Sequence, residues 1–206
     1  MNKTPKPHDL LWGFAPDQLP ADAPAWARLA MASGHPVVVR RAHCIPGQVA
    51  VGIRGTTRDQ RYGTCMPLAA IQRRITPEQL TTPPATGTWP ALCALAEIKP
   101  LLDATGQPWG PTGGVGFQLA TGIAVLHAAS DLDLLLRAPN PFSRQQAREL
   151  LAALAAASCR VDLQLETPAG AVALREWAGP SARVLLKCAE GARLVLDPWQ
   201  ALERAA

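Results

Sequence analysis

The sequence predicts a mixed α/β protein with a small N-terminal α+β domain over residues 1–84 and a larger α/β domain over residues 85–206. Three observations support this prediction. Two strand-like segments flank a turn in the first part of the chain. In the second part, segments follow in the order helix, glycine turn, helix, strand, helix, strand, which is typical of a mixed α/β domain. Between the two parts, residues 81–87 contain two prolines and a glycine and are the best candidate for a linker.

The first part is expected to contain a short helix and a hairpin. The helix covers residues 24–32. Residues 36–41 and 48–54 are the strands, and the second of them alternates polar and apolar side chains as a half-buried strand does. Because the Ile-Pro-Gly sequence at residues 45–47 favours a turn, the two strands are expected to pair. A basic polar loop follows at residues 54–63.

The second part is expected to begin with a helix over residues 89–104. Pro90 is tolerated in the first turn of this helix, whereas Pro100 is expected to kink or break it. The glycine-rich segment at residues 110–116 then forms a turn that opens another short helix. A strand that contains two aspartates follows.

A capping box indicates where the next helix begins. Ser143 is the expected N-cap, and Gln146, three residues later, completes the motif. This helix is expected to run to about residue 158, and residues 159–166 alternate as a strand does. Further short strands are expected at residues 171–177, 183–187 and 193–196.

The composition is that of a globular protein with enough apolar residues to bury a core. Of 206 residues, 48% are hydrophobic, and the formal net charge is only +4. A charge this small does not argue for nucleic-acid binding. No apolar run reaches the roughly 20 residues that a membrane span needs, and the N-terminus lacks the apolar region of a signal peptide. We therefore expect a soluble, cytoplasmic protein that binds neither nucleic acid nor membrane.

The cysteines are expected to be free thiols. They are odd in number, they are scattered along the chain, and no two of them have CxxC spacing. This pattern is typical of a protein in a reducing compartment and argues against a disulfide framework or a zinc site. The residues are Cys44, Cys65, Cys93, Cys159 and Cys188.

The most informative motif is a pair of aspartates, Asp131 and Asp133, at the start of an apolar run. Side chains alternate along a strand, so both carboxylates are expected on one face and Leu132 and Leu134 on the other. Two acids this close repel each other unless a cation lies between them. Carboxylate oxygens suit Mg²⁺, which leaves its other positions to water and phosphates. The alternative is a capping turn or a solvated strand edge, but a charge inside an apolar strand is costly.

A glycine pair precedes the aspartates. Gly113 and Gly114 let the backbone approach a ligand closely, and their N–H groups would lie at a helix N-terminus, where phosphate binds well. A plain tight turn is the alternative interpretation. The turn lacks the Lys-Ser/Thr ending of a P-loop, and it is a poor dinucleotide fingerprint.

A third acid, Asp162, lies in the next expected strand. Its period of two places Asp162, Gln164 and Glu166 on one face. If this strand pairs beside the strand with the two aspartates, Asp162 completes a site of three carboxylates that can hold metal and help to deprotonate a hydroxyl. The alternative is the exposed polar face of an edge strand. In the basic loop, Arg58 and Arg61 are candidates for contacting phosphate or an acidic carrier protein, unless the loop is only a solvated surface.

The order of a glycine pair, a D-x-D strand and a third acid resembles the nucleotidyltransferase superfamily typified by DNA polymerase beta. In that superfamily the glycine turn holds the triphosphate and the acids hold Mg²⁺. The resemblance therefore implies a polymerase-beta-like nucleotidyltransferase domain in the second part of the chain. The superfamily usually has Gly-Ser where this chain has Gly113-Gly114, so one hydroxyl contact to phosphate is missing.

Four motifs together resemble the malonate decarboxylase holo-acyl-carrier-protein synthases, also called phosphoribosyl-dephospho-CoA transferases. The resemblance covers nearly the whole chain. It implies an enzyme that attaches 2′-(5″-phosphoribosyl)-3′-dephospho-CoA to a serine of the apo acyl-carrier subunit of malonate decarboxylase. The donor it implies is 2′-(5″-triphosphoribosyl)-3′-dephospho-CoA, from which diphosphate leaves. The motifs lie at residues 8–12, 110–122, 130–134 and 194–199.

The resemblance also implies roles for the candidate residues. Asp131 and Asp133 would hold Mg²⁺, Asp162 would be the general base or a third metal ligand, and Gly113 and Gly114 would cradle the phosphates. Three alternatives stay open: an equivalent transferase for the citrate lyase carrier, a transferase acting on a small substrate, and a nucleotide-binding module without catalysis.

Overall fold

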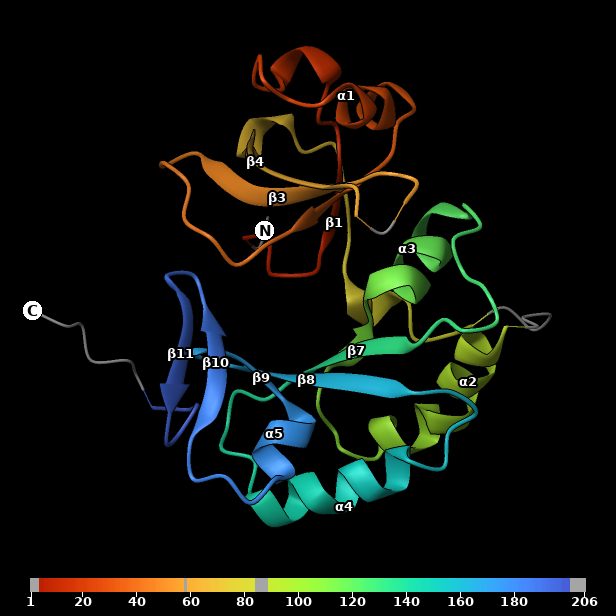
Figure 1. Cartoon of the computed structure of the whole chain (residues 1–206), viewed down its shortest axis with the longest axis vertical. Helices are drawn as coiled ribbons and strands as arrows, with labels where there is room; N and C mark the ends of the chain where they lie inside the picture. Colours follow the sequence, from red (N-terminus) through yellow and green to blue (C-terminus); the bar gives the residue numbers. More distant parts are fainter. Residues whose placement is uncertain (1–3, 58, 84–88, 201–206) are drawn as a thin grey trace, which may run out of the picture. The chain divides into compact units, whose positions relative to one another are not determined.

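The computed structural model describes residues 4–57, 59–83 and 89–200, and these residues form two compact units that divide between Thr76 and Pro77 (Figure 1). Each unit has its own sheet and its own core. The division lies earlier than the expected boundary after residue 84, because the 3-10 helix η3 (Pro77–Gln79) packs against β6 (Trp109–Pro111) of the second unit. The expected linker at 81–87 lies mostly outside the described residues.

The first unit is built on a five-stranded antiparallel sheet with the order β4-β3-β2-β1-β5. The expected pairing of the two strands around residues 45–47 is confirmed, since β2 and β3 are antiparallel neighbours. One further strand begins inside the segment expected as a basic loop. The elements are β1 (Leu10–Trp12), η1 (Pro16–Gln18), α1 (Ala25–Ala32), β2 (Val37–Val39), β3 (Gln48–Arg54), β4 (Arg61–Pro67), η2 (Leu68–Ala70) and β5 (Arg73–Ile75).

One disulfide joins Cys44 to Cys65, so the expectation of five free thiols is wrong for this pair. The long ladder between β3 and β4 explains the contact. Cys65 lies opposite Ala50 on that ladder, and Cys44 lies in the segment that leads into β3, with 6.2 Å between the two cysteine Cα atoms. The sequence separation of 21 residues gives no hint of this pairing. Cys159 and Cys188 are thiols, as expected.

The second unit is built on a six-stranded sheet with the order β11-β10-β9-β8-β7-β6. Neighbouring strands are antiparallel except β7 and β8, which run parallel. A parallel pair needs a crossover, and α4 (Arg144–Leu154) supplies it. The strands are β6, β7 (Leu132–Arg137), β8 (Val161–Thr167), β9 (Gly170–Ala173), β10 (Val184–Cys188) and β11 (Gly191–Val195).

Helices cover both faces of this sheet. The helices α2 (Pro90–Asp103) and α4 pack on one face of β7, and α3 (Gly113–Thr121) lies on the other (Figure 1). The core on the α2 and α4 side contains alternate residues of β7, which are fully buried. The other face of β7 carries Asp133 and Arg137 together with Leu135, which is also fully buried. The buried β7 residues of this core are Leu132, Leu134 and Leu136.

Two expectations for the second unit need correction, and one is confirmed. The helix α2 does not break at Pro100 but continues to Asp103. The strand expected over 171–177 ends at Ala173, and α5 (Leu174–Ala178) follows. The capping box at α4 is confirmed: the Ser143 hydroxyl accepts from the Gln146 N–H at 3.1 Å, and the Ser143 N–H donates to the Gln146 side chain at 2.8 Å.

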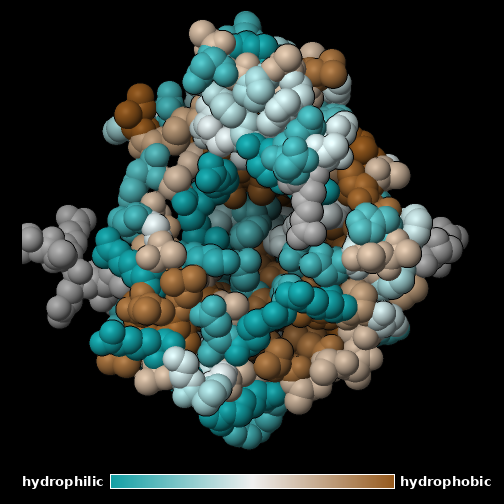
Figure 2. Space-filling model, in the orientation of Figure 1, coloured by the Kyte–Doolittle hydropathy of each residue, from teal (hydrophilic) through white to brown (hydrophobic). Residues whose placement is uncertain are grey.

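The surface of the second unit has an apolar region over β10 and β11 (Figure 2). Leu194 on the edge strand β11 and Leu196 just after it are each 65% exposed. Within the part of the chain that the structure describes, no helix has the length and apolar character required to cross a lipid bilayer.

Candidate active site

Three aspartates meet at the beginning of the parallel strands β7 and β8. The register pairs Asp133 with Asp162, and Asp131 directly precedes β7. One carboxylate oxygen from each residue lies within 4.8 Å of the other two, and all three side chains are partly buried. The expected face is therefore correct, because Asp133 lies opposite the buried Leu132 and Leu134, and Asp162 lies opposite the buried Leu163. The edge-strand alternative for Asp162 does not hold, since β8 is an inner strand of the sheet.

The glycine turn lies directly against the second aspartate. β6 pairs with β7, and the chain then enters α3 at Gly113. Gly113 has a φ of 57°, and a Cβ atom at this position would overlap the Asp133 carboxylate. The Thr112 N–H also donates to the Asp133 carbonyl oxygen at 2.8 Å. The missing side chain at Gly113 is thus what allows Asp133 to approach the first turn of α3.

Only the first glycine of the pair is required for close packing. A Cβ atom at Gly114 would have only the Leu126 side chain near it, at 3.2 Å, and Gly114 does not have a left-handed φ. The N–H groups of the first turn of α3 have no acceptor within the helix, and the side chain of the N-cap Thr112 does not cap them. These donors and the helix dipole favour an anion at this end of α3.

Two arginines lie against Asp162. The Arg160 Nη2 atom is 2.9 Å from one carboxylate oxygen, and Arg175 donates to the other from α5. The Arg160 side chain is 64% exposed and the Arg175 side chain 49%, so water screens both ion pairs and each adds little to stability. Sequence reasoning did not identify either arginine, because their contacts with Asp162 depend on where β8 begins and where α5 follows β9.

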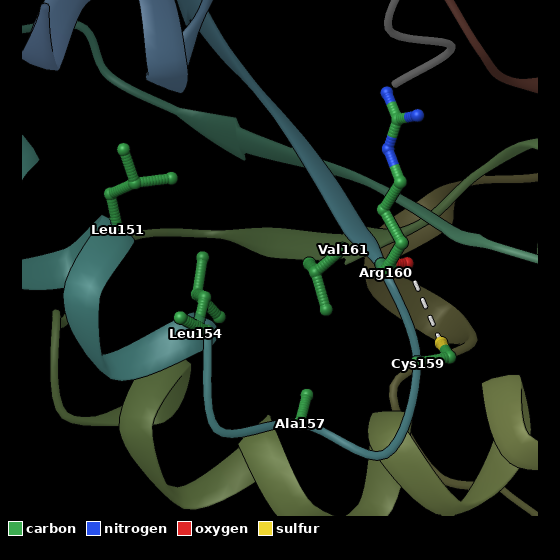
Figure 3. A pocket seen from close by; sticks show the side chains of 7 residues that line it. Leu151, Leu154, Ala157, Cys159, Arg160 and Val161 are labelled. Carbon is green, nitrogen blue, oxygen red and sulfur yellow. Dashed lines mark hydrogen bonds between the residues drawn. The ribbon is translucent and has the colours of Figure 1, made fainter.

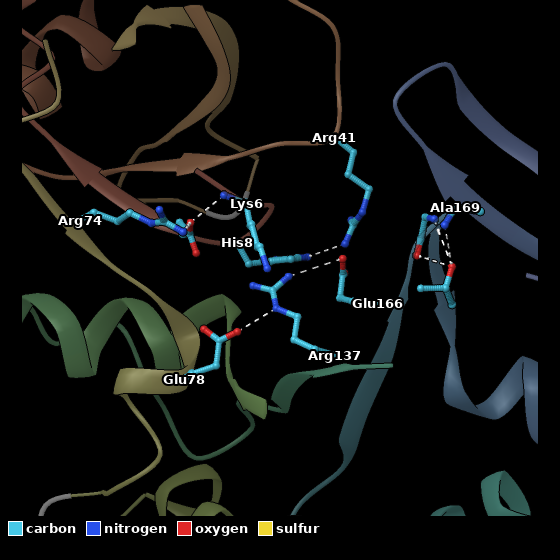
Figure 4. Close-up of polar contacts among 11 residues, drawn as sticks. Lys6, His8, Arg41, Arg74, Glu78, Arg137, Glu166 and Ala169 are labelled. Atoms are coloured by element: carbon cyan, nitrogen blue, oxygen red, sulfur yellow. Dashed lines mark hydrogen bonds and ion pairs between the residues drawn. The ribbon is translucent and has the colours of Figure 1, made fainter. Parts of the chain in front are cut away.

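Farther along β8, the acid Glu166 is used in a different way. Glu166 lies on the same face as Asp162 but at the other end of the strand, where Arg137 lies between it and Glu78 (Figure 4). The distances from Arg137 to the two glutamates are 2.8 Å for Glu78 and 3.7 Å for Glu166. Between the ends, the buried Gln164 Oε1 has no hydrogen-bond partner among the described residues.

Of the two arginines expected from the basic loop, Arg61 lies in the first unit and Arg58 lies outside the described residues. Arg61 is the first residue of β4, and its Nη1 atom donates to the carbonyl oxygens of Thr57 at 3.2 Å and Gln60 at 2.9 Å. Arg61 therefore closes its own loop, and the acidic cluster belongs entirely to the second unit.

A pocket of about 420 Å³ lies next to the beginning of β8 (Figure 3). Its lining is apolar except for Arg160, whose side chain points away from the leucines and pairs with Asp162. Burial, together with the nearby Asp131 carboxylate, raises the pKa of the Cys159 thiol in the same wall. The pocket thus adjoins the acidic cluster. Its lining residues are Leu151, Leu154, Ala155, Ala157, Cys159, Arg160 and Val161.

Two family models match the chain. The model of the phosphoribosyl-dephospho-CoA transferase MdcG N-terminal domain matches residues 6–77, and that of the MdcG C-terminal domain matches residues 79–198. The junction between the two matches lies within two residues of the division between the two compact units. The acidic cluster and the glycine turn both lie within the C-terminal match.

Curated relatives named phosphoribosyl-dephospho-CoA transferase are similar over nearly the full length. A protein of Pseudomonas putida (strain W619) is 63% identical over 98% of both chains. One of Pseudomonas fluorescens (strain Pf-5) is 60% identical over 97% of this chain and 96% of its own, and one of Azotobacter vinelandii (strain DJ) is 59% identical over 95% of both. No solved structure matches the chain.

Proposed function

The chain belongs to the phosphoribosyl-dephospho-CoA transferase MdcG family, and from this premise we propose the reaction that it catalyses. The enzyme transfers the 2′-(5″-phosphoribosyl)-3′-dephospho-CoA group from 2′-(5″-triphosphoribosyl)-3′-dephospho-CoA to a serine of the apo acyl-carrier subunit of malonate decarboxylase. The observation that carries this proposal is the meeting of Asp131, Asp133 and Asp162 beside the Gly113 turn. Acids next to a phosphate-binding helix end suit the transfer of a phosphoryl-linked group.

The second unit is proposed to act as a nucleotidyltransferase domain of the polymerase-beta type. Three features support this: the glycine turn opens α3, the D-x-D pair lies at the start of the next strand, and the third acid lies on the neighbouring parallel strand. In this arrangement the N–H groups at the start of α3 would bind and orient the phosphates of the donor.

The cluster suits Mg²⁺, because its possible ligands are carboxylate oxygens that lie close enough together to bind one ion. Gly113 leaves room for the Asp133 carboxylate. Asp131 and Asp133 would hold the ion. When bound, Mg²⁺ offsets negative charge on the donor phosphates and on the departing diphosphate.

The transfer itself needs little covalent work from the protein. The serine oxygen forms a bond to the α-phosphorus of the donor, and the bond between that phosphorus and the diphosphate oxygen breaks. Asp162 is proposed to accept the proton that the serine hydroxyl loses. Positioning of the two reactants and stabilisation of the phosphate charges supply most of the rate enhancement.

Mass spectrometry of the carrier tests this proposal. The purified apo-carrier of malonate decarboxylase is incubated with the full chain, the triphosphoribosyl donor and Mg²⁺. We expect the carrier mass to increase by that of the transferred group, with release of diphosphate, and no increase when the metal is chelated. Labelling of the citrate lyase carrier alone would assign the equivalent transferase instead. Absence of labelling on both carriers by folded enzyme would refute the transferase proposal.

A further inference from the structure

We infer that Arg175 is a phosphate-binding residue of this enzyme: it neutralises Asp162 while the donor is absent and turns to the donor's polyphosphate when the donor binds. The inference rests on the proposed function, because it assigns a role in that same site. It concerns a residue on α5 that neither the sequence motifs nor the glycine turn indicate.

The sheet brings Arg175 to Asp162 through its register. β9 runs antiparallel to β8 with Ala173 opposite Gln164, so the chain beyond Ala173 continues toward the level of Asp162. On the other side of β8, Asp133 lies opposite Asp162. Asp133, Asp162 and Arg175 therefore follow one another across neighbouring segments of the second unit, and the Arg175 guanidinium reaches the acidic cluster at its third carboxylate.

The backbone that carries Arg175 is fixed, but its side chain can change partner. On either side of it, Leu174 is 1% exposed and Trp177 8% exposed, and the Trp177 indole N–H donates to the Phe142 carbonyl oxygen. The Arg175 side chain, by contrast, is 49% exposed. An ion pair screened by water is weak, so leaving Asp162 for another anion costs little.

A polyphosphate is the anion that suits this guanidinium best. Arginine has a planar fork of donors that matches phosphate oxygens in a bidentate arrangement. A polyphosphate bound at the start of α3 beside Asp133 would offer more negative charge than the single carboxylate of Asp162. Once Arg175 turned to the phosphates, the Asp162 oxygen that it now contacts, Oδ1, would be available to accept the serine proton. Arg160, which pairs with the other Asp162 oxygen, lies at the mouth of the apolar pocket.

If Arg175 changes partner in this way, its removal should raise the affinity for the metal ion and lower the affinity for polyphosphate. Arg175→Gln leaves three carboxylates without this competing cation, so Mg²⁺ or Mn²⁺ alone should bind at least about threefold more tightly. The same variant removes a charged hydrogen-bond donor to phosphate, so tripolyphosphate in the presence of the metal should bind roughly 10- to 100-fold more weakly. Isothermal titration calorimetry measures both. Arg175→Lys, which keeps the charge, should restore part of the tripolyphosphate affinity.

The matched control is Arg193→Gln, which removes the same charge from the exposed edge strand β11 at the far side of the sheet. We expect it to change neither affinity. If Arg175→Gln leaves both affinities unchanged, or weakens metal binding, Arg175 only holds Asp162 in place and the inference is wrong. These measurements do not use the carrier. Opposite shifts without carrier labelling would therefore refute the carrier assignment and keep the role of Arg175.

Discussion

The substitution Gly113→Ala should damage the candidate active site, whereas the neighbouring Gly114→Ser should not. At Gly113 the backbone has a φ of 57°, and a left-handed conformation costs an L-residue about 1–2 kcal/mol. The added Cβ atom would also overlap the Asp133 carboxylate, so that carboxylate must turn away or the first turn of α3 must move. Loss of one well-placed ligand should weaken metal binding by at least about tenfold.

At Gly114 the same addition meets only the Leu126 side chain, at 3.2 Å, which has to shift by a few tenths of an ångström. Serine also has a higher helix propensity than glycine, which offsets this cost. The two variants are compared by thermal unfolding, Mn²⁺ titration and carrier labelling. We expect Gly113→Ala to lose metal affinity and transfer, and Gly114→Ser to resemble the unsubstituted enzyme. Equal metal affinity in Gly113→Ala and the unsubstituted chain would refute the close packing of Gly113 and Asp133, and inactivity of Gly114→Ser would show that the turn packs differently.

Three further predictions concern the same unit. Asp131→Ala and Asp133→Ala should each lower carrier labelling by at least about a hundredfold. The unfolding temperature should be no lower than before, because each substitution removes one of several like charges. Full activity in either variant would exclude the substituted aspartate as a metal ligand. Ser143→Ala breaks the capping box at the start of α4 and should cost about 1 kcal/mol of unfolding free energy in denaturant titrations, with transfer unchanged; an unchanged midpoint would mean that the cap does not stabilise α4. Burial and the Asp131 carboxylate raise the pKa of the Cys159 thiol, so less thiolate forms and iodoacetamide should modify it more slowly than an exposed cysteine. Asp131→Asn should increase the rate, and equal rates with and without Asp131 would show that its carboxylate does not suppress the thiolate.

The parts of the site that could be predicted are those encoded by local periodicity. Asp133 has to lie on the face opposite its neighbours Leu132 and Leu134, and the alternation around Asp162 places that residue in the same way on β8. The helix between them, marked by its capping box, makes a parallel crossover possible, and the register then aligns Asp133 with Asp162. The glycine turn could be placed before the aspartates, but only the packing shows that Gly113, and not Gly114, makes room for Asp133.

The parts that could not be predicted depend on contacts between distant segments. The pairing of Cys44 with Cys65 follows from the ladder between β3 and β4. The polar sequence at residues 54–63, where β4 begins, does not indicate that ladder. The three-residue strands β1 and β5 are too short to show a period. The helix α5 has its buried residues three and four positions apart, which is a helical pattern, but it is only five residues long, so the sequence favours a continuing strand there. Arg175 could not be connected with Asp162 before that turn was known.

The location of a bound metal ion tests the central claim most directly. Crystals of the full chain grown with Mn²⁺ and tripolyphosphate would be measured at the manganese absorption edge, where anomalous scattering identifies the ion. We expect one strong anomalous peak about 2.1 Å from carboxylate oxygens of both Asp131 and Asp133, with phosphate oxygens beside the first turn of α3. An ion bound elsewhere in the protein while those two aspartates face solvent would contradict the claim that they and the glycine turn form the catalytic centre.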